Sequence, residues 1–97
     1  MAQIVYSRNA ITNLERVFAF LLEQDPQAAI ASATAIREAV ELLANHPMIG
    51  RRVEGEIREL VISFGKTGYV ALYRFLPMRE EVRILAIRPQ RELDFPA

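Results

Sequence analysis

The sequence predicts an α+β fold in which a helical hairpin packs on one face of a small antiparallel sheet, in the order β-α-α-β-β-β. The first observation is a pair of segments with apolar residues at helical spacing, separated only by Asp25-Pro26. The second is a set of three runs in the last third of the chain that are rich in β-branched and aromatic residues. Short connections join these runs, so they form antiparallel hairpins rather than parallel crossovers.

A short strand and a helix open the chain. The strand is expected at Gln3 to Tyr6, and Ser7 is a suitable N-cap for a helix from Arg8 to about Gln24. The apolar residues at helical spacing in this helix are Ile11, Leu14, Val17, Phe18, Leu21 and Leu22. They predict a face that packs against the rest of the domain.

A second helix is expected from Pro26 to about Asn45. Asp25 caps it, and Pro26 suits the first helical position, where a missing N–H costs nothing. The residues on its apolar face are Ala29, Ala33, Ile36, Val40 and Leu43. His46-Pro47 ends the helix. With almost no loop between them, the helices form an antiparallel hairpin.

Three strands follow a polar connection from Met48 to Gly55. They are expected at Ile57–Ser63, Tyr69–Phe75 and Val82–Arg88. A glycine-bearing turn, Gly65 to Gly68, separates the first two, and Leu76 to Glu81 separates the second and third. The three strands therefore form a meander.

The register of the first hairpin decides where its arginines lie. If the hairpin is symmetric about Lys66, Arg58 lies opposite Arg74. Two like charges directly opposite each other destabilise a sheet unless carboxylates intervene or the site binds an anion. Nearby glutamates keep local ion pairing open as an alternative. If the second hairpin has matching parity, Arg88 lies about 13 Å along the sheet from Arg74.

Length and composition bound the class of protein. A chain of 97 residues with 52% hydrophobic residues predicts one domain over residues 1–97. Without cysteine there is no disulfide framework or thiolate metal site. No metal or cofactor is expected, because ligand clusters and phosphate-binding glycine loops are missing. Without a transmembrane-length apolar run or a signal-peptide pattern, a cytoplasmic protein with no membrane partner is expected.

Charge is unevenly distributed, although the formal net charge is zero. Residues 1–50 hold three arginines against five acidic residues, or −2, and residues 51–97 hold eight arginines and Lys66 against seven acidic residues, or +2. Arginine favours forked contacts to carboxylate or phosphate. One interpretation is a basic patch that meets phosphate or an acidic protein, and the other is a solvated sheet surface with mixed charges.

The histidine and the tyrosines of the sheet have structural interpretations. His46 lies at a helix end, where a histidine is typical of contacts to the last helical carbonyls. Tyr69 and Tyr73 alternate with small or apolar residues, which indicates packing residues rather than general bases.

Several segments of the chain follow one another in an order that is typical of one toxin superfamily. They are Ile4 to Ser7, the helical hairpin, the Pro-x-x-Gly-Arg segment within His46 to Arg52, Ile57 to Val61, Tyr69 to Phe75, and Arg83 to Arg88 followed by Arg91-Glu92. No segment is specific alone, but the order and spacing extend over nearly the whole chain. In these features the chain resembles the RelE/ParE superfamily, the toxins of type II toxin–antitoxin (plasmid stabilisation) modules. The resemblance implies growth inhibition that a cognate antitoxin neutralises.

The superfamily divides by target. RelE-like members cleave messenger RNA in the ribosomal A site, whereas ParE-like members inhibit DNA gyrase. RelE-like nucleases usually place an arginine three residues before a central tyrosine, but before Tyr73 that position holds Val70. They also tend to carry a C-terminal His or Tyr, and none follows Tyr73. ParE-like members tend to end in an apolar run, His, Arg and an acid; Arg88 holds the His position, and Arg91-Glu92 follows.

The resemblance therefore favours a ParE-like gyrase inhibitor that is not an enzyme. The residues implied for target or antitoxin contacts are Arg58, Arg74, Arg88 and Arg91, with the tail from Leu93 to Ala97 contributing. The alternative is a ribosome-dependent endoribonuclease whose RNA-holding residues are Arg51, Arg52, Arg74 and Arg88. A third alternative is a non-toxic member that only binds an antitoxin. Direct DNA binding is not expected except through the antitoxin.

An apolar groove for the antitoxin is also expected. A domain this small cannot easily cover both faces of a sheet with two helices. The groove is predicted on the uncovered face, with some of Tyr69, Tyr73 and Phe75 in its floor. A partly disordered antitoxin segment would add a helix or a strand there, with acidic residues that pair with the arginines named above.

Overall fold

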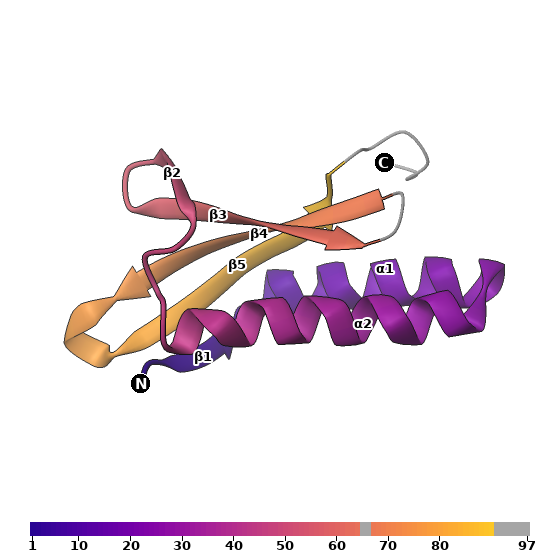
Figure 1. Ribbon diagram of the computed structural model, residues 1–97, viewed down its shortest axis with the longest axis horizontal. Coiled ribbons are helices and arrows are strands. Elements are labelled where there is room, and N and C mark those ends of the chain that lie inside the picture. The colour runs from indigo at the N-terminus through magenta and orange to yellow at the C-terminus, as the bar shows by residue number, and fades with distance from the viewer. Residues whose placement is uncertain (65–66, 91–97) are drawn as a thin grey trace.

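A helical layer and a sheet make up the protein in a computed structural model that describes residues 1–64 and 67–90. The elements within these residues are β1 (Gln3–Tyr6), α1 (Arg8–Gln24), α2 (Pro26–Glu41), the 3₁₀ turn η1 (Leu42–Ala44), β2 (Arg51–Glu54), β3 (Ile57–Phe64), β4 (Thr67–Leu76), the 3₁₀ turn η2 (Pro77–Arg79) and β5 (Glu81–Pro89). Helices α1 and α2 lie on the same face of the sheet (Figure 1). The predicted α+β class and helical hairpin are therefore confirmed.

The sheet is mixed rather than purely antiparallel. In the described part of the chain five strands have the order β1-β5-β4-β3-β2, and β1 runs parallel to β5 while the other neighbours are antiparallel. The parallel pair is possible because the whole helical hairpin and the meander separate β1 from β5 in the chain. The predicted order β-α-α-β-β-β thus lacked one strand, β2.

Strand β2 occupies part of the segment that the sequence predicted as a connection. All four of its residues are exposed, and only Val53 among them is apolar. It forms by backbone pairing with β3, where Arg51 lies opposite Glu59 and Arg52 opposite Arg58. No alternation of buried and exposed residues marks such an edge strand, so its sequence gives no strand signal.

The helix boundaries follow the predicted caps. The Ser7 hydroxyl accepts a hydrogen bond from the Ala10 N–H at 3.0 Å at the start of α1. The Asp25 carboxylate caps α2 in the same way, and Pro26 is the first residue of that helix. Helix α2 ends at Glu41, earlier than predicted, because the last turn tightens into η1.

Among the described residues, no helix is both long enough and apolar enough to cross a membrane.

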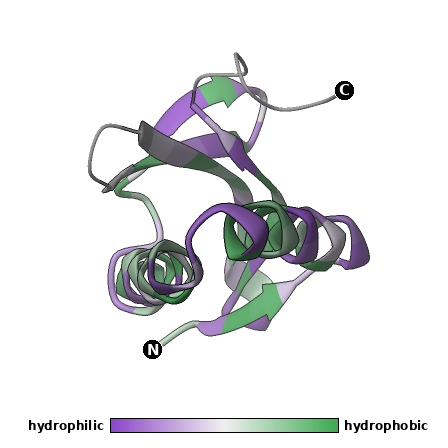
Figure 2. Cartoon of the chain, turned by 90° about the vertical axis from the view of Figure 1, so that its right-hand side faces the viewer, coloured by the Kyte–Doolittle hydropathy of each residue, from purple (hydrophilic) through white to green (hydrophobic). Residues whose placement is uncertain are grey.

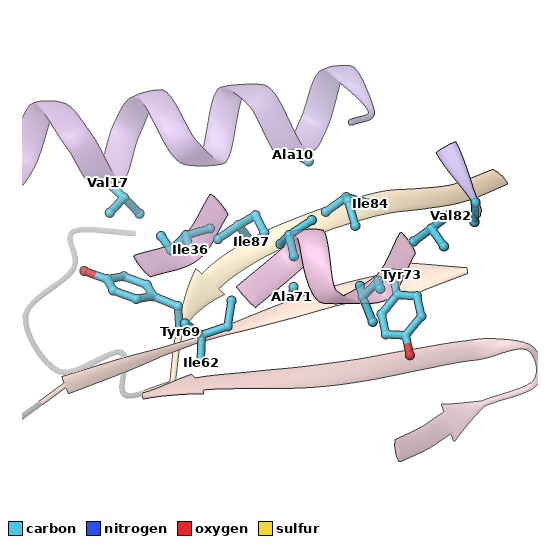
Figure 3. Close-up of a cluster of buried hydrophobic side chains, with 13 residues drawn as sticks. Ala10, Val17, Ile36, Ile62, Tyr69, Ala71, Tyr73, Val82, Ile84 and Ile87 are labelled. Atoms are coloured by element: carbon cyan, nitrogen blue, oxygen red, sulfur yellow. The ribbon is translucent and has the colours of Figure 1, made fainter. Parts of the chain in front are cut away.

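Alternate residues of β4 face the helices. Tyr69, Ala71 and Tyr73 belong to the buried core, together with Ile36 of α2 and Ile84 of β5. Side chains from both layers converge in this cluster (Figure 3). Figure 2, a view nearly along the helices, shows α1 and α2 side by side. We call the helix-facing side of the sheet the covered face and the opposite side the open face.

The register of the first hairpin differs by one residue from the prediction. Phe64 pairs with Thr67, so Ile57 lies opposite Arg74 and Arg58 lies opposite Tyr73. The paired strands are separated by two residues rather than by an odd number, so the pairing is not centred on Lys66. Because side chains alternate between faces, a slip of one residue moves every side chain to the other face. Arg58 and Arg74 are therefore on opposite faces.

The same alternation overturns the predicted groove. Tyr69 and Tyr73 are 3% and 0% exposed beneath the helices, and Phe75 packs against the core on the same face. None of the three lies on the open face. The side chains that β4 turns to the open face instead include Leu72 and Arg74.

Candidate functional site

Arginines from two central strands lie together on the open face. Arg74 of β4 is paired with Arg83 of β5. Arg88 is paired with Val70, four residues along β4 from Arg74. Four residues at strand rise correspond to about 13 Å, the spacing that the sequence predicts for Arg74 and Arg88.

Arg51 of β2 extends this surface toward the sheet edge. It lies opposite Glu59, which in turn lies opposite Leu72 on the open face. The Arg51 guanidinium donates two hydrogen bonds to the Glu59 carboxylate, the Nε one at 3.1 Å. We call the open-face arginines the arginine face; its members are Arg51, Arg74, Arg83 and Arg88.

Carboxylates neutralise part of the arginine face. The Arg83 guanidinium lies 2.7 Å from the Glu81 carboxylate, whose side chain is only 12% exposed. Arg74 and Arg88 are exposed and form no ion pair with another residue in the described ranges. These two guanidinium groups are therefore the ones left to bind a partner.

Apolar side chains lie between the arginines. They are Val61, Val70, Leu72 and Ala86, and Val61 is 49% exposed. Protein interfaces commonly combine an apolar centre with arginine, which covers apolar surface with its methylenes and donates several hydrogen bonds. The composition of the open face is thus suited to a protein partner as well as to phosphate.

Arg58, a predicted contact residue, is bound to the protein's own backbone. Its Nη1 group donates to the carbonyl oxygen of Met48 at 3.2 Å and to that of Gly50 at 2.8 Å. The residue of β4 that lies opposite Arg58 in the sheet is the buried Tyr73 rather than Arg74. Arg58 therefore holds the segment that leads into β2.

Arg52 also binds backbone. Its Nε and Nη2 groups donate to the carbonyl oxygen of Gly55 at 3.2 and 3.0 Å, and its guanidinium lies 4.0 Å from the Glu56 carboxylate. Gly55 has φ +54°, the left-handed region that glycine adopts without strain. These contacts stabilise the turn between β2 and β3.

Tyr73 and Gly50 form a buried contact beside Arg58. The Tyr73 hydroxyl oxygen accepts a hydrogen bond from the Gly50 N–H at 2.8 Å. A Cβ atom on Gly50 would lie 2.6 Å from the Glu59 carbonyl oxygen and equally close to the Tyr73 ring and hydroxyl. Burial raises the pKa of Tyr73, and the Gly50 hydrogen bond and the Arg58 charge oppose that rise. Tyr73 is therefore a neutral structural residue at pH 7.

A second feature is an apolar pocket between α1, α2 and the end of β1. Its volume is about 290 Å³, and its apolar walls come from Leu14, Val17, Phe18, Ala29, Ala33 and Ile36. Glu15 and Arg37 also line it, as does Tyr6 of β1. Burial, and then the charge of Glu41, raises the pKa of Tyr6, while Arg37 lowers it. We call this the hairpin pocket.

Ser32 gives the hairpin pocket its one buried polar group among the described residues. The side chain is 1% exposed, and its Oγ atom has no hydrogen-bond partner within the described part of the chain. An unsatisfied buried hydroxyl costs about 1–3 kcal/mol. A bound group that could hydrogen-bond to Oγ would remove this cost.

The remaining predicted features lie elsewhere or outside the described residues. Arg91 and the tail from Leu93 to Ala97 lie outside the described ranges. His46 is exposed in the turn between η1 and β2. Within residues 1–64 and 67–90, no three His, Asp or Glu side chains are grouped closely enough to bind a metal.

Sequence reasoning missed Arg83 and the hairpin pocket. Arg83 and Arg88 are an odd number of residues apart, so a regular strand would place them on opposite faces. The pocket is lined by residues that the helical pattern assigns to packing, and nothing marks Ser32 as unpartnered. The excess of arginine in the second half of the chain was the one signal that indicated the arginine face.

Known proteins are similar to this chain in sequence and in fold. Residues 4–94 match the family described as "ParE toxin of type II toxin-antitoxin system, parDE". "Toxin RelE3" of Caulobacter vibrioides is 40% identical over 86 residues, which cover 89% of this chain and 88% of that protein. "Toxin RelE1" of the same organism is 34% identical over 73 residues, covering 75% and 78%.

Two solved structures have a similar fold. One, "Chromosomal ParDE TA system from P. aeruginosa", has a TM-score of 0.75 at 23% identity, over 91% of this chain and 95% of that one. The other, the intact E. coli RelBE toxin–antitoxin complex, has a TM-score of 0.62 at 11% identity, with the same coverage. The fold and sequence together define a toxin of a type II toxin–antitoxin system. The chain belongs to the ParE toxin family, within the RelE/ParE superfamily.

Proposed function

We propose that this toxin inhibits DNA gyrase by binding it through the arginine face, and that a cognate antitoxin neutralises it. The observation that carries the proposal is the pair of exposed arginines, Arg74 and Arg88, with apolar side chains between them and no imidazole or phenol beside them on the described part of the open face. Such a surface suits binding more than proton transfer. We infer an inhibitor that acts by occupying its target rather than by catalysis.

The chemistry of RNA cleavage argues against a nuclease. Cleavage requires a group that removes the 2′-hydroxyl proton, a cation for the developing phosphorane charge and an acid for the leaving oxygen. The arginine face supplies the cations. Tyr69 and Tyr73 are turned into the core, and His46 lies in a turn outside the strands. On the described part of the open face, no imidazole or phenol accompanies the arginines.

Ribosome-dependent cleavage of messenger RNA is the second candidate. It is favoured by the names of the two Caulobacter relatives, both of which are called RelE toxins. Arg74 and Arg88 could bind the RNA backbone, since forked guanidinium contacts suit phosphate. In this candidate the proton-transfer groups would be the glutamates of the open face or groups of the ribosome.

The hairpin pocket is the surface that we propose for the antitoxin. Helix α1 also has exposed apolar side chains, Ile11, Phe18 and Leu22, of which Phe18 lines the pocket. They recur at intervals of seven and four residues and span about 16 Å at helical rise. Exposed apolar side chains on one helix face beside an apolar pocket are typical of an interaction site, and an amphipathic helix is the shape that fits a groove between two helices.

Polar groups of the pocket would set the specificity of that contact. Ser32 Oγ offers an unused hydrogen bond at the base, and Arg37 and Glu15 lie along the lining. An antitoxin side chain that reaches Ser32 while its neighbours pair with Arg37 would satisfy both. The antitoxin site would then be separate from the arginine face.

Expression without antitoxin tests the target. Inhibition of gyrase predicts filamentous cells with damaged DNA, and purified toxin should inhibit supercoiling by gyrase in vitro. Cleaved messages and a rapid loss of translation would instead support the ribosomal candidate. A chain that has neither effect at any expression level would be a non-toxic, antitoxin-binding family member.

A further inference from the structure

Strand β5 contains a β-bulge at its centre. Tyr73 is paired with Ile84, but the next residue back along β4, Leu72, is paired with Ala86. Strand β5 therefore uses one residue more than β4, and the extra residue is Leu85. A bulge leaves backbone groups of the bulged strand without partners in the ladder.

The bulge decides which face Arg88 occupies. Arg83 and Arg88 are five residues apart, and an unbroken strand would turn them to opposite faces. With the bulge between them, both lie on the open face, while Ile84 and Ile87 both lie in the core at 0% and 1% exposure. Without the bulge, Arg88 would lie on the covered face, and burying an unpaired charge there would cost much free energy.

Polar side chains at the start of α1 bind the backbone of β5 at the bulge and two residues after it. The Leu85 carbonyl oxygen accepts from the Ser7 hydroxyl at 3.1 Å and from the Asn9 side-chain amide at 3.0 Å. The Ile87 N–H donates to Asn13 Oδ1 at 2.9 Å. These three bonds satisfy backbone groups of β5 at Leu85 and Ile87, and each joins residues more than 70 positions apart in the chain.

We propose that Ser7, Asn9 and Asn13 are positioning residues that fix this bulge and thereby hold Arg88 on the arginine face. That Arg88 then serves in inhibition rests on the proposed function; the positioning itself does not. Asn13 is the best residue to mutate, because it accepts a hydrogen bond from the N–H of Ile87, the residue next to Arg88. Ser7 also caps α1, so its loss would have a second effect.

Thiol reactivity tests the positioning without reference to any target. The chain has no cysteine, so Arg88→Cys and Ile87→Cys each introduce a single thiol. In the parent chain, the thiol at position 88 should react with a maleimide at least about 100-fold faster than the buried thiol at position 87. Asn13→Ala should reduce this ratio at least about tenfold. Asn13→Asp, which keeps an oxygen acceptor, should leave it within about twofold.

Two controls separate local from global effects. Thr12→Ala changes an exposed neighbour of Asn13 on α1 and should leave the ratio unchanged. Ile62→Cys reports on the core side of β3, which β4 separates from the bulged strand β5. An unchanged ratio in Asn13→Ala would overturn the proposal. The proposal would also fail if Asn13→Ala raised the reactivity of the thiol at position 62 as much as that of the thiol at position 87, because Asn13 would then act on the whole fold.

Growth inhibition supplies the functional test. Asn13→Ala should raise the expression level needed to halve growth, and it should add little in an Arg88→Ala background, since the two act through one group. Independent, additive effects would overturn the positioning of Arg88 by Asn13. If the parent toxin leaves gyrase unaffected, the gyrase proposal fails, while the thiol ratios still decide the positioning.

Discussion

The two faces of β4 differ in burial, so that neighbouring residues of the strand lie in opposite environments. Tyr73 is fully buried and hydrogen-bonded to the Gly50 N–H, whereas Arg74, the next residue, is exposed and makes no ion pair within the described part of the chain. The covered face determines stability, because it packs against both helices. The open face contributes few buried contacts, so its residues can serve a partner. The alternation of one strand thus separates buried residues from exposed residues that are available to a partner.

The largest contrast should appear between a core residue and an arginine. Ile84→Ala removes a fully buried side chain and should lower the free energy of unfolding by about 2–5 kcal/mol. Arg74→Ala, at an exposed position on the open face, should change it by about 0.5 kcal/mol or less. Chemical denaturation of both variants measures this contrast. Equal losses would show that the open face is part of the stabilising structure.

A smaller loss of stability is expected when the hydrogen bond between Tyr73 and Gly50, in the segment before β2, is removed. Tyr73→Phe leaves the buried Gly50 N–H without its acceptor and should cost about 1–3 kcal/mol. Tyr6→Phe is the matched control, since the half-buried Tyr6 has no hydrogen bond to another described residue. It should cost about 0.5 kcal/mol or less. If thermal and chemical unfolding find the two variants alike, the Tyr73–Gly50 bond does not stabilise the fold.

The sequence predicted this separation of faces only in part. Ser7, Asp25 and Pro26 fix the helix ends by local hydrogen bonding and geometry, so the hairpin could be predicted. The strands of the meander could be predicted from their β-branched and aromatic runs. Their faces could not, because the number of turn residues that close the first hairpin shifts the register by one.

The parts that were missed depend on long-range backbone contacts. Strand β2 is held by pairing with β3 and by Arg58, which binds carbonyl groups eight and ten residues earlier in the chain. At the bulge, the Leu85 carbonyl accepts hydrogen bonds from Ser7 and Asn9, whose polar character suggests only a capping turn. The sequence predicts arginines as contact residues, but it could not separate Arg58, which binds backbone carbonyls, from Arg74, which is exposed on the open face.

The smallest predicted effect is on the pH dependence of stability. Burial raises the pKa of Tyr73 in the folded state, whereas in the unfolded chain a tyrosine ionises near its usual pKa of about 10. The unfolded state therefore loses its proton first. The stabilisation is complete below about pH 10 and is lost as the pH rises through the folded pKa.

Tyr73→Phe removes this contribution, so its free energy of unfolding should fall less steeply above pH 10 than that of the parent protein. Tyr6 has a raised pKa as well and accounts for part of the remaining slope. Urea denaturation at a series of pH values from 8 to 11 measures the difference. Parallel curves for the two proteins would mean that Tyr73 ionises in the folded state as easily as in the unfolded chain.

The central claim is that the open face binds the target and the hairpin pocket binds the antitoxin. The direct measurement compares two variants in two assays, inhibition of gyrase supercoiling and affinity for the cognate antitoxin. The combined Arg74→Glu and Arg88→Glu changes should abolish inhibition and leave antitoxin affinity within about threefold. Ala33→Trp, which fills the pocket, should weaken the antitoxin at least about tenfold and spare inhibition, while Ala31→Trp on the exposed side of α2 should change neither. Loss of both activities in either variant, or inhibition that survives reversal of both arginine charges, would contradict the account.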